Sequence, residues 1–367
     1  MKNILFLTPY VPSSKAGGEN FTRLVLLELS KENKIDLIYY RYKNDPYYIA
    51  PNANVNVLKV CNNSTLIKLF HVLLFPFVHP LFSIRFSWLL LFRIFIQLKK
   101  KNYDLIYLDH SQMFLYGKFI SNHRKILMSH DVMIQRYSRK KELFQQIIIG
   151  KSESWVLKMN NAVIFTFSDK DRDLVFKYYG LQSEVTHFYL DVNNENAMPC
   201  VISKTLVFFG KWKRKDNYEG LYWFFNTVYP LIKEFGYKYV IIGAGLDHNF
   251  ATHFVDKNIE YMGFVDNPYN IISNSLAMIS PLFSGAGVKV KVVESLACGT
   301  PVIGTKIAFE GIDARFSDFM LEVQEPSSYI EQIQNLNISL GKRIEFKRRF
   351  ISQYRKYSLA NYINSTL

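Results

Sequence analysis

The chain has 367 residues, 49% of them hydrophobic, so it can bury a sizeable core and its length favours two domains. The net charge of +14 at pH 7 is compatible with nucleic acid, an anionic membrane surface or phosphate-bearing substrates as partners. Three scattered cysteines, Cys61, Cys200 and Cys298, are too few for a disulfide framework or a zinc site and fit a reducing cytosol.

The N-terminal sequence MKNILFLTPYVP predicts a buried first strand rather than a signal peptide, because no small-residue cleavage site follows it. Basic clusters lie at residues 99–101, 139–141, 211–215 and 342–349. No RNA- or DNA-binding signature accompanies them. We therefore rank a membrane surface and sugar-nucleotide phosphates above nucleic acid as partners.

The first half of the chain begins like a doubly wound α/β domain. Asn3–Thr8 is a continuous apolar run of strand length, and residues 9–18 form a loop that ends in two glycines. A helical period over Asn20–Leu29 and a second strand at Ile35–Tyr40 complete the strand–loop–helix–strand pattern.

Residues 66–98 are strongly apolar and aromatic, yet they do not predict a transmembrane helix, which needs about 20 uninterrupted apolar residues. Prolines, arginines and histidines break the run at Pro76, Pro80, Arg85, Arg93, His71 and His79. Two interpretations stay open. The helices either lie partly on a bilayer, with the lysines at 99–101 behind them, or form a fully buried pair.

Two histidine–aspartate pairs follow predicted strands. Asp109-His110 comes after a strand at Tyr103–Leu108, and His130-Asp131 after a strand at Lys125–Met128. Ligands of open parallel sheets bind at the carboxyl ends of strands, so both pairs are candidate site residues, although such pairs are more often structural. A further strand is predicted at residues 162–167.

The second half repeats the alternation of strands and helices after a linker near residues 194–203. Strands are predicted at Leu206–Phe209, Tyr239–Ile242, Ile259–Phe264 and Leu276–Ile279, with a helix from Asn217 to Phe225. Residues 327–367 have a helical, basic pattern.

The most informative stretch runs from Pro281 to Gly311. A loop, Ser284-Gly285-Ala286-Gly287, precedes a short helix that carries Lys291 and Glu294 three positions apart, on one face. A Gly-rich turn at a helix N-terminus leaves backbone N–H groups free for an anion. A cation for phosphate and a carboxylate for ribose hydroxyls suit a nucleotide diphosphate. The alternative is a βαβ unit whose glycines only allow tight packing.

This stretch, SGAGVKVKVVESLACGTPVIGT followed by Phe309-Glu310-Gly311-Ile312, resembles the donor-site signature of the glycosyl transferases group 1, which are retaining enzymes of the GT-B fold. Similar segments run from about residue 2 to residue 312. Many members carry two glutamates eight positions apart. This chain keeps the second as Glu294 and has Ala286 in place of the first, as does a subgroup with a lysine at the position of Lys291. The role of Glu294 therefore carries over, and the role of the first glutamate does not.

The resemblance implies a donor site in the second half and an acceptor site in the first. Lys211 stands where many members have an arginine that faces the donor phosphates, whereas Asp216 stands roughly at the position of their lysine, and Lys291 is expected to supply the missing charge. The nucleotide base of the donor is expected to pack at Phe264-Val265, largely through backbone contacts. Gly17 and Gly18 either approach the donor diphosphate or only shape their turn.

The predicted sites are, for the donor, Gly17, Gly18, Gly210, Lys211, Asn217, Gly243, Phe264, Val265, Ser284, Gly285, Ala286, Gly287, Val288, Lys291 and Glu294; for catalysis, His130, Lys211, Lys291 and Glu294; and for the acceptor, His130, Asp131 and Arg136. No Asp-x-Asp metal motif stands at a strand end, so we expect neither a metal nor another cofactor.

The resemblance also implies an α/β fold of GT-B type, with two Rossmann-like doubly wound domains facing a cleft. We expect an acceptor domain at residues 1–197, a donor domain at 198–345 and, at 346–367, a C-terminal helix that packs back on the first domain.

The implied function is a retaining, metal-independent glycosyltransferase. It would move a sugar from a nucleotide diphosphate sugar to a glycan or lipid-linked acceptor, for cell-surface polysaccharide synthesis. We expect it in the cytoplasm, peripherally bound to the anionic inner face of the membrane. A sugar-nucleotide epimerase of the same fold and a non-catalytic scaffold protein remain alternatives, and Ala286 is the best support for the second.

Overall fold

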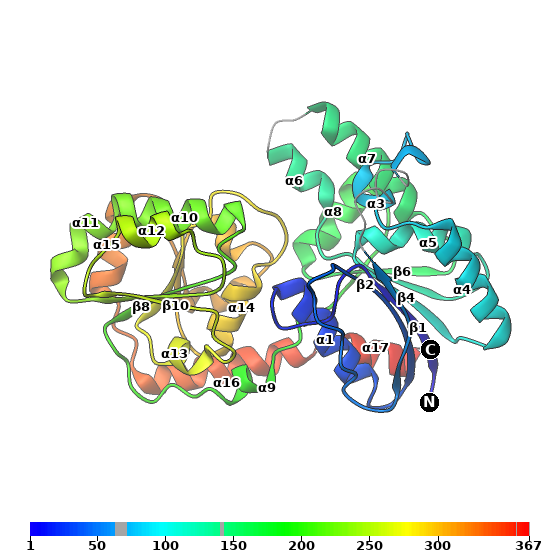
Figure 1. Ribbon diagram of the computed structural model, residues 1–367. Coiled ribbons are helices and arrows are strands. Elements are labelled where there is room, and N and C mark those ends of the chain that lie inside the picture. The colour runs from blue at the N-terminus through cyan, green and yellow to red at the C-terminus, as the bar shows by residue number, and fades with distance from the viewer. Residues whose placement is uncertain (63–71, 140–142, 357, 367) are drawn as a thin grey trace. The chain divides into compact units, whose positions relative to one another are not determined.

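The computed structural model describes residues 1–62, 72–139, 143–356 and 358–366, and it divides the chain into two compact units (Figure 1). The first unit comprises Met1–His187 together with the C-terminal residues from 357 onward, and the second comprises Phe188–Lys356. Each unit contains one parallel sheet with helices around it, which is the Rossmann-like architecture that the sequence predicts.

The first unit has a seven-stranded sheet in the order β3-β2-β1-β4-β5-β6-β7. Its strands are β1 (Asn3–Thr8), β2 (Lys34–Arg41), β3 (Val55–Asn62), β4 (Leu105–Asp109), β5 (Lys125–Met128), β6 (Ala162–Thr166) and β7 (Glu184–Val185). The helices are α1 (Gly17–Leu29), α3 (Pro80–Ser83), α4 (Trp88–Lys100), η1 (Ser111–Met113), α5 (Phe114–Phe119), α6 (Met133–Arg139), α7 (Leu143–Leu157), α8 (Asp169–Tyr179) and α17 (Leu359–Thr366).

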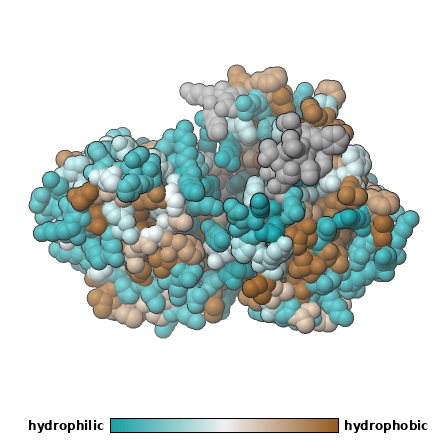
Figure 2. Space-filling view, viewed as in Figure 1, coloured by the Kyte–Doolittle hydropathy of each residue, from teal (hydrophilic) through white to brown (hydrophobic). Residues whose placement is uncertain are grey.

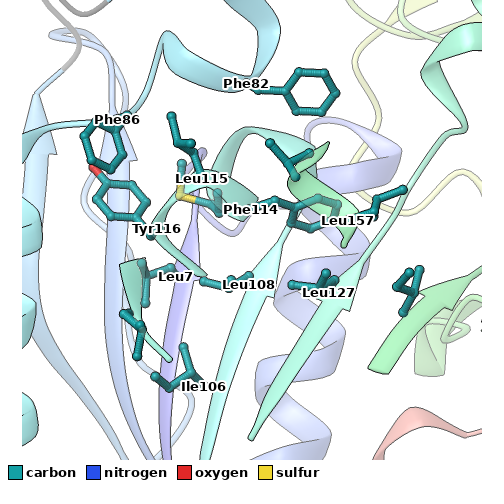
Figure 3. Packing of buried hydrophobic residues seen from close by; sticks show 14 of the residues in the cluster. Leu7, Phe82, Phe86, Ile106, Leu108, Phe114, Leu115, Tyr116, Leu127 and Leu157 are labelled. Atoms are coloured by element: carbon teal, nitrogen blue, oxygen red, sulfur yellow. The ribbon is translucent and has the colours of Figure 1, made fainter. Parts of the chain in front are cut away.

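The core of the first unit forms where one face of this sheet meets the surrounding helices. Leu7, Leu108 and Leu127 project from the neighbouring strands β1, β4 and β5 toward aromatic residues such as Phe114 (Figure 3). The central strands are buried over nearly their whole length because helices cover both faces of the sheet. Such strands have continuous apolar sequences, and for this reason β1 and β5 lie where the sequence predicts them.

The second unit has a six-stranded sheet in the order β10-β9-β8-β11-β12-β13. Its strands are β8 (Thr205–Phe209), β9 (Lys238–Ile242), β10 (Ile259–Gly263), β11 (Ala277–Ser280), β12 (Val302–Gly304) and β13 (Met320–Glu322). The helices are α9 (Val192–Asn196), α10 (Lys215–Thr227), α11 (Tyr229–Ile232), η2 (Lys233–Phe235), α12 (His248–His253), α13 (Tyr269–Ser273), α14 (Val290–Ala297), η3 (Lys306–Phe309), η4 (Ala314–Phe319), α15 (Pro326–Asn335) and α16 (Leu340–Lys356).

The division between the units falls before α9, because the α9 segment packs on α14. The buried Asn194 donates to the backbone oxygen of Glu294 at 2.8 Å, and the buried Lys347 donates to the oxygens of Asn194 and Ala297 at 3.0 and 2.7 Å. These bonds tie residues 188–197 to the second unit, although the sequence analysis assigns them to the first.

The C-terminal region forms two helices rather than one. Helix α16 belongs to the second unit, where the fully buried Arg343 donates to the backbone oxygens of Ser275 and Leu276. Helix α17 packs beside α1 in the first unit, where Lys2 donates to the oxygen of Ile363 at 2.7 Å. No helix among the described residues is both long enough and apolar enough to cross a membrane.

Gly220 allows α10 to lie directly against the strand end that leads into the loop at 284–287. A Cβ atom at this position would lie 1.9 Å from the backbone oxygen of Pro281. We expect Gly220→Ala to destabilise the second unit by about 1–3 kcal/mol, the usual cost of overpacking, although alanine favours helices elsewhere. The measurement is equilibrium unfolding followed by near-UV circular dichroism.

Gly341→Ala is the matched control. It lies in α16, and no atom within 4 Å would obstruct its Cβ. We expect this substitution to be neutral or to stabilise the protein by about 0.4–1 kcal/mol, because alanine lowers the conformational entropy of the unfolded chain. Equal unfolding midpoints for the two variants would contradict the close contact between α10 and Pro281.

Candidate functional site

The loop Ser284–Gly287 joins β11 to α14 and depends on its glycines. Gly285 and Gly287 have φ angles of 125° and 67°, which residues other than glycine rarely adopt. The N-terminus of α14 follows, and its N-cap, Lys289, provides no side-chain cap. The backbone N–H groups of Val292 and Val293 donate to the oxygen of Lys289 at 2.8 and 3.2 Å, so it is those of Val290 and Lys291, at the start of the helix, that an anion can bind.

Asn217 connects this loop region to the end of β8. The ammonium group of Lys291 donates to Oδ1 of Asn217 at 3.0 Å, and Nδ2 of Asn217 donates to the backbone oxygen of Lys211 at 3.0 Å. The side chain of Asn217 also lies against Gly210, where an added Cβ would be 3.0 Å from Nδ2. The structure thus brings together Gly210, Lys211, Asn217 and Lys291, which the sequence predicts to face the donor phosphates.

The charge on Lys291 is only marginally stable in this structure. Burial lowers its pKa to about 7, and the positive charges of Arg214 and Lys289 lower it in the same direction, while Asp216 opposes them. A cation that is crowded by other cations is stabilised when an anion binds. The electrostatics of Lys291 therefore favour a multiply charged anion such as a diphosphate.

Asp216 holds the glycine loop against α10. Its carboxylate accepts from Oγ of Ser284 at 3.1 Å and from Arg214 at 3.4 Å. The resemblance gave Asp216 no donor role, because many members have a lysine there. In this chain Asp216 fixes one side of the loop, and Arg214, which the sequence analysis did not select, is a further cation beside it.

Lys289 fixes the other side of the loop. Its ammonium group donates to the backbone oxygens of Ala286 at 3.2 Å and Gly287 at 2.6 Å, and it lies 3.9 Å from a carboxylate oxygen of Glu310. The sequence analysis placed Lys289 and Glu310 in the motif without giving either a role. Because Lys289 and Glu310 are 21 positions apart, only the fold identifies Glu310 as part of the loop's surroundings.

Glu294 lies on α14 one turn after Lys291 and faces α13. Its Oε1 accepts from the hydroxyl of Tyr269 at 3.0 Å. Burial raises the pKa of Glu294 to about 7, although the hydrogen bond from Tyr269 acts in the opposite direction. Tyr269 had no sequence signal, since the contact spans 25 residues.

The remaining predicted donor residues of this unit lie at the ends of β9 and β10. The backbone N–H of Gly243 donates to the oxygen of Gly263 at 2.7 Å, and a Cβ on Gly243 would lie 1.8 Å from the oxygen of Gly210. A cavity of about 340 Å³ opens here and is lined in part by Gly243, Asp247 and Gly263. Phe264, which is 51% exposed, and Val265 follow directly after β10, and Val288 precedes α14 as a buried residue.

The histidines of the first unit gather around the carboxylate of Asp109, which is fully buried at the end of β4. Thr8 and Thr22 donate to its Oδ2 at 3.1 and 2.5 Å, and Nε2 of His130 lies 2.9 Å from Oδ1. Burial alone would favour the neutral acid, but the imidazoles of His110 and His130 and these hydrogen bonds hold the pKa of Asp109 below its usual value. Asp109 thereby fixes the orientation of His130.

His110 packs flat against His130, with ring centroids 3.4 Å apart and planes inclined by 15°. Its φ angle of 61° with ψ near 150° is a region almost confined to glycine, and such strain of roughly 1–3 kcal/mol persists where the surroundings impose it. Burial and the neighbouring His130 lower the pKa of His110 far below its usual value, although the carboxylate of Asp109 acts in the opposite direction.

Gly18 makes room for this histidine pair. A Cβ at Gly18 would lie 3.0 Å from Cε1 of His110 and 3.6 Å from Nδ1 of His130. Gly17 and Gly18 are the first residues of α1, and the N-cap, Ala16, has no side-chain cap. Within the first unit, the glycines therefore place a helix N-terminus beside the imidazoles. Their approach to the donor stays a prediction.

Asp109, His110 and His130 offer ligand atoms within 4.8 Å of one another, which is close enough for a metal ion. The two rings are nearly parallel, however, and the lone pair of an imidazole nitrogen lies in the plane of its ring. Parallel rings direct these lone pairs side by side, so they do not converge on one ion. The geometry fits a hydrogen-bonded aspartate–histidine pair better than a metal centre.

The other two residues predicted for the acceptor lie next to this cluster in the chain. The backbone oxygen of Asp131 accepts from Oγ of Ser129 at 3.2 Å, and Arg136 is exposed on α6. The start of α6 is fixed by the buried Glu153, which accepts from the backbone N–H groups of Met133 and Ile134 at 3.0 and 3.1 Å.

A family model and one curated relative match the chain. Residues 203–337 match the model of the glycosyl transferases group 1. An uncharacterized 44.6 kDa protein in the cps region of Klebsiella pneumoniae is 24% identical over 155 residues, which cover 38% of this chain. The matched segment spans 39% of that protein's own length.

Two solved structures share the fold over nearly the whole chain. Anabaena Alr3699/HepE, in complex with UDP and glucose, is similar with a TM-score of 0.66 at 13% identity, covering 100% of this chain and 98% of that one. The S. aureus TarM G117R mutant, in complex with Fondaparinux, alpha-GlcNAc-glycerol and UDP, gives a TM-score of 0.67 at 11% identity, covering 99% and 98%. Both units contain one parallel sheet, and the likeness to these structures shows that the chain has the GT-B fold, with the match to the glycosyl transferases group 1 lying in residues 203–337.

Proposed function

We propose that the protein is a retaining, metal-independent glycosyltransferase that takes its sugar from a UDP-sugar. The arrangement around Lys291 supports this most strongly. The proposed diphosphate site of the second unit combines a glycine loop with the uncapped N-terminus of α14. It also contains three cations: Lys291, Arg214 and the exposed Lys211. UDP is bound in both solved relatives described above.

In this proposal the cations and backbone N–H groups stabilise the negative charge that grows on the leaving diphosphate. Fixed donors and charges of this kind are most effective where charge develops in the transition state. They take the place of a metal ion. Glu294 accepts from the ribose hydroxyls, and the sugar transfers to the same face from which the diphosphate departs, so no protein nucleophile is required.

The acceptor site belongs to the first unit in this proposal, with His130 as the residue nearest the transferred sugar. Asp109 orients the imidazole through Nε2, which leaves Nδ1 to contact a hydroxyl. The acceptor is a glycan or lipid-linked sugar of a cell-surface polysaccharide. The relative encoded in a cps region supports that context.

The direct test is a transfer assay with the purified full-length chain, a panel of UDP-sugars and a mixture of lipid-linked and free glycan acceptors. NMR of the product should show the anomeric configuration of the donor, and activity should persist in excess EDTA. An inverted product would refute retention, and activity lost in EDTA but restored by Mg²⁺ or Mn²⁺ would refute metal independence. A donor that binds but is only epimerised, or never consumed, would favour one of the two alternative functions.

The membrane part of the proposal rests on α4. This helix buries Leu90, Leu91 and Ile94, while its other face exposes large apolar side chains: Trp88, Leu89, Phe92, Phe95 and Ile96. Figure 2 shows hydrophobic side chains on this side of the first unit. The exposed Lys99 and Lys100 form the last turn of α4. An exposed apolar face that ends in lysines suits the headgroup region of an anionic bilayer. Residues 66–71 of the predicted membrane segment lie outside the described residues.

Replacing Lys99 and Lys100 by glutamate should weaken binding to anionic vesicles, because each lysine near such a surface contributes about 1 kcal/mol. Loss of both therefore predicts roughly a tenfold to thirtyfold weaker partition in co-sedimentation, with the difference shrinking at high salt. Lys101 is left unchanged, because its ammonium group pairs with the buried Asp36 at 2.7 Å and a change there would disturb the fold.

Lys257→Glu/Lys342→Glu is the control, since both lysines are exposed in the second unit. It makes the same change in net charge and should leave vesicle binding nearly unaltered. Binding of UDP should be unchanged in both double variants. If both double variants lost vesicle binding equally, the effect would be one of net charge alone. Wild-type protein that does not bind anionic vesicles would refute the membrane proposal.

A further inference from the structure

Arg85 is a buried cation without an anionic partner among the described residues. It lies between α3 and α4 and is only 4% exposed. Its Nη2 donates to the hydroxyl of Tyr42 at 3.1 Å, and its Nε makes a long bond of 3.4 Å to Oε1 of Gln112. Its Nη1 is buried and has no hydrogen-bond partner in the described part of the chain.

Such a group is costly to a folded protein. A buried charge is normally paired, and a buried donor is normally bonded, because both lose their interactions with water. The aromatic rings of Tyr10, Tyr40 and Tyr42 lie 5.9, 5.5 and 5.5 Å from the guanidinium carbon and offset part of this cost through cation–π attraction. They leave the hydrogen-bonding capacity of Nη1 unused.

The position of Arg85 is fixed by its own backbone. Its carbonyl oxygen accepts from the hydroxyls of Tyr40 at 2.5 Å and Tyr116 at 2.8 Å, both within the buried core. With the backbone fixed in this way and the guanidinium bonded to Tyr42 and Gln112, the cation is held in place before any ligand arrives, which reduces the entropy lost on binding.

The residues around Arg85 lie at the carboxyl edge of the sheet, the edge at which open parallel sheets bind their ligands. Tyr10, Tyr42 and Gln112 follow the carboxyl ends of β1, β2 and β4, three neighbouring strands. The amide of Gln112 donates to the hydroxyl of Tyr10 at 3.2 Å, and the ring of Tyr10 stands edge-on to His110 at 5.3 Å. Tyr42 is 46% exposed, so solvent reaches this side. The cation thus adjoins the histidine cluster within the same unit.

We propose that Arg85, with Tyr10, Tyr42 and Gln112, forms an anion subsite that binds a phosphate or carboxylate group of the acceptor. Arginine presents a planar fork of N–H donors that matches two oxygens of either group. The unused Nη1 supplies one of these donors, and the phenol and amide groups bond the remaining oxygens. The assignment of the anion to the acceptor rests on the proposed glycosyltransferase function, whereas the anion site itself does not.

The test is calorimetric titration of the full-length protein in saturating UDP, which occupies the donor site. The probes are inorganic pyrophosphate, glycerol phosphate and glucuronate, with glucose as the neutral control. We expect at least one anion to bind, with an affinity that falls as salt rises, and glucose not to bind. A phosphate preference points to a phosphate-bearing acceptor, and a glucuronate preference to an acidic glycan.

Arg85→Gln removes the charge while keeping a polar side chain, and it should weaken anion binding at least tenfold. Arg93→Gln, at an exposed arginine on α4, is the matched control and should bind like wild type. Gln112→Leu provides a second variant that leaves the arginine in place and should also weaken binding. Anion binding that is equal in wild type, Arg85→Gln and Gln112→Leu, or absent from wild type, would overturn the proposal.

Failure of this subsite and failure of the proposed function are separable. If the anion site exists but the protein transfers no sugar, anion binding persists and depends on Arg85. If the protein is a glycosyltransferase without this subsite, transfer proceeds and Arg85→Gln leaves the KM for the acceptor unchanged. With both correct, Arg85→Gln raises the KM for an anionic acceptor and leaves the affinity for UDP as it was.

Discussion

Glu294→Ala is expected to weaken binding of a UDP-sugar by about tenfold to a hundredfold without unfolding the protein. A hydrogen bond to a charged group is worth roughly 1.5–3 kcal/mol, and 1.4 kcal/mol corresponds to a factor of ten. Glu294 lies on the same face of α14 as Lys291 and is already held by one donor, the hydroxyl of Tyr269. Its second oxygen is directed by that bond and completes the ribose site in our proposal. Calorimetry with UDP and with a UDP-sugar measures the loss.

Tyr269→Phe distinguishes the role of the Glu294 carboxylate from that of the hydroxyl that donates to it. This variant removes the hydroxyl that bonds Oε1 but keeps the acid, so we expect a much smaller loss of donor affinity than with Glu294→Ala. Thermal unfolding checks that both proteins fold. A Glu294→Ala protein that binds the donor as tightly as wild type would mean that the carboxylate serves only to bond Tyr269 and α13.

The donor motif could be read from the sequence because its parts are local. The glycines that adopt positive φ, the helix that follows them and the face shared by Lys291 and Glu294 all lie within residues 284–294. The central strands could be predicted for a related reason, since a strand buried on both faces needs a continuous apolar run.

Three of the edge strands, β3, β7 and β13, gave no such signal. In β3 only Val55 is buried and the other residues are half-buried or exposed, and β7 and β13 have only two and three residues. A short or half-exposed strand owes its place to its neighbour in the sheet rather than to its own composition. Most of each sheet's centre and the edge strand β10 were therefore predicted from the sequence, whereas β3, β7 and β13 were missed.

Long-range contacts explain what was missed in the sites. Asp109 and His110 were candidates, but the hydrogen bond between Asp109 and His130 and the stacking of His110 on His130 arise only because the ends of β4 and β5 meet at one sheet edge. Arg85 was seen only as a break in an apolar run. Its burial among tyrosines from other strands is what makes it a candidate anion site, and no local pattern encodes that.

The affinity for a UDP-sugar is expected to be greatest near pH 7 and to fall on both sides. Burial and neighbouring cations lower the pKa of Lys291 to about 7, so above this pH the free protein must take up a proton before the ammonium can meet the diphosphate. The affinity then falls by up to about tenfold per pH unit. Burial raises the pKa of Glu294 to about 7, so below this pH the carboxyl is protonated and must lose its proton to accept fully from the ribose.

Two variants test which residue causes each fall in affinity. Lys291→Arg carries a guanidinium that stays charged throughout, so the fall in affinity above pH 7 should disappear. Glu294→Gln removes the titrating acid, so the fall below pH 7 should disappear, although the affinity is lower at every pH. A UDP-sugar is the right ligand, because its diphosphate does not ionise in this range. The number of protons taken up, measured by calorimetry in buffers of different ionisation enthalpy, should rise toward one above pH 7 in the wild type.

Lys291→Met should reduce kcat far more than stability. Removing one donor to the developing charge in an active site costs roughly a hundredfold to a thousandfold in kcat. The folded protein loses little, because the lysine is held near Arg214 and Lys289, whose charges oppose its own. We expect the unfolding midpoint to stay the same or rise, as is common where a residue is kept for activity at a cost in stability. A Lys291→Met protein with wild-type kcat and a pH profile that still falls above pH 7 would show that another group binds the diphosphate.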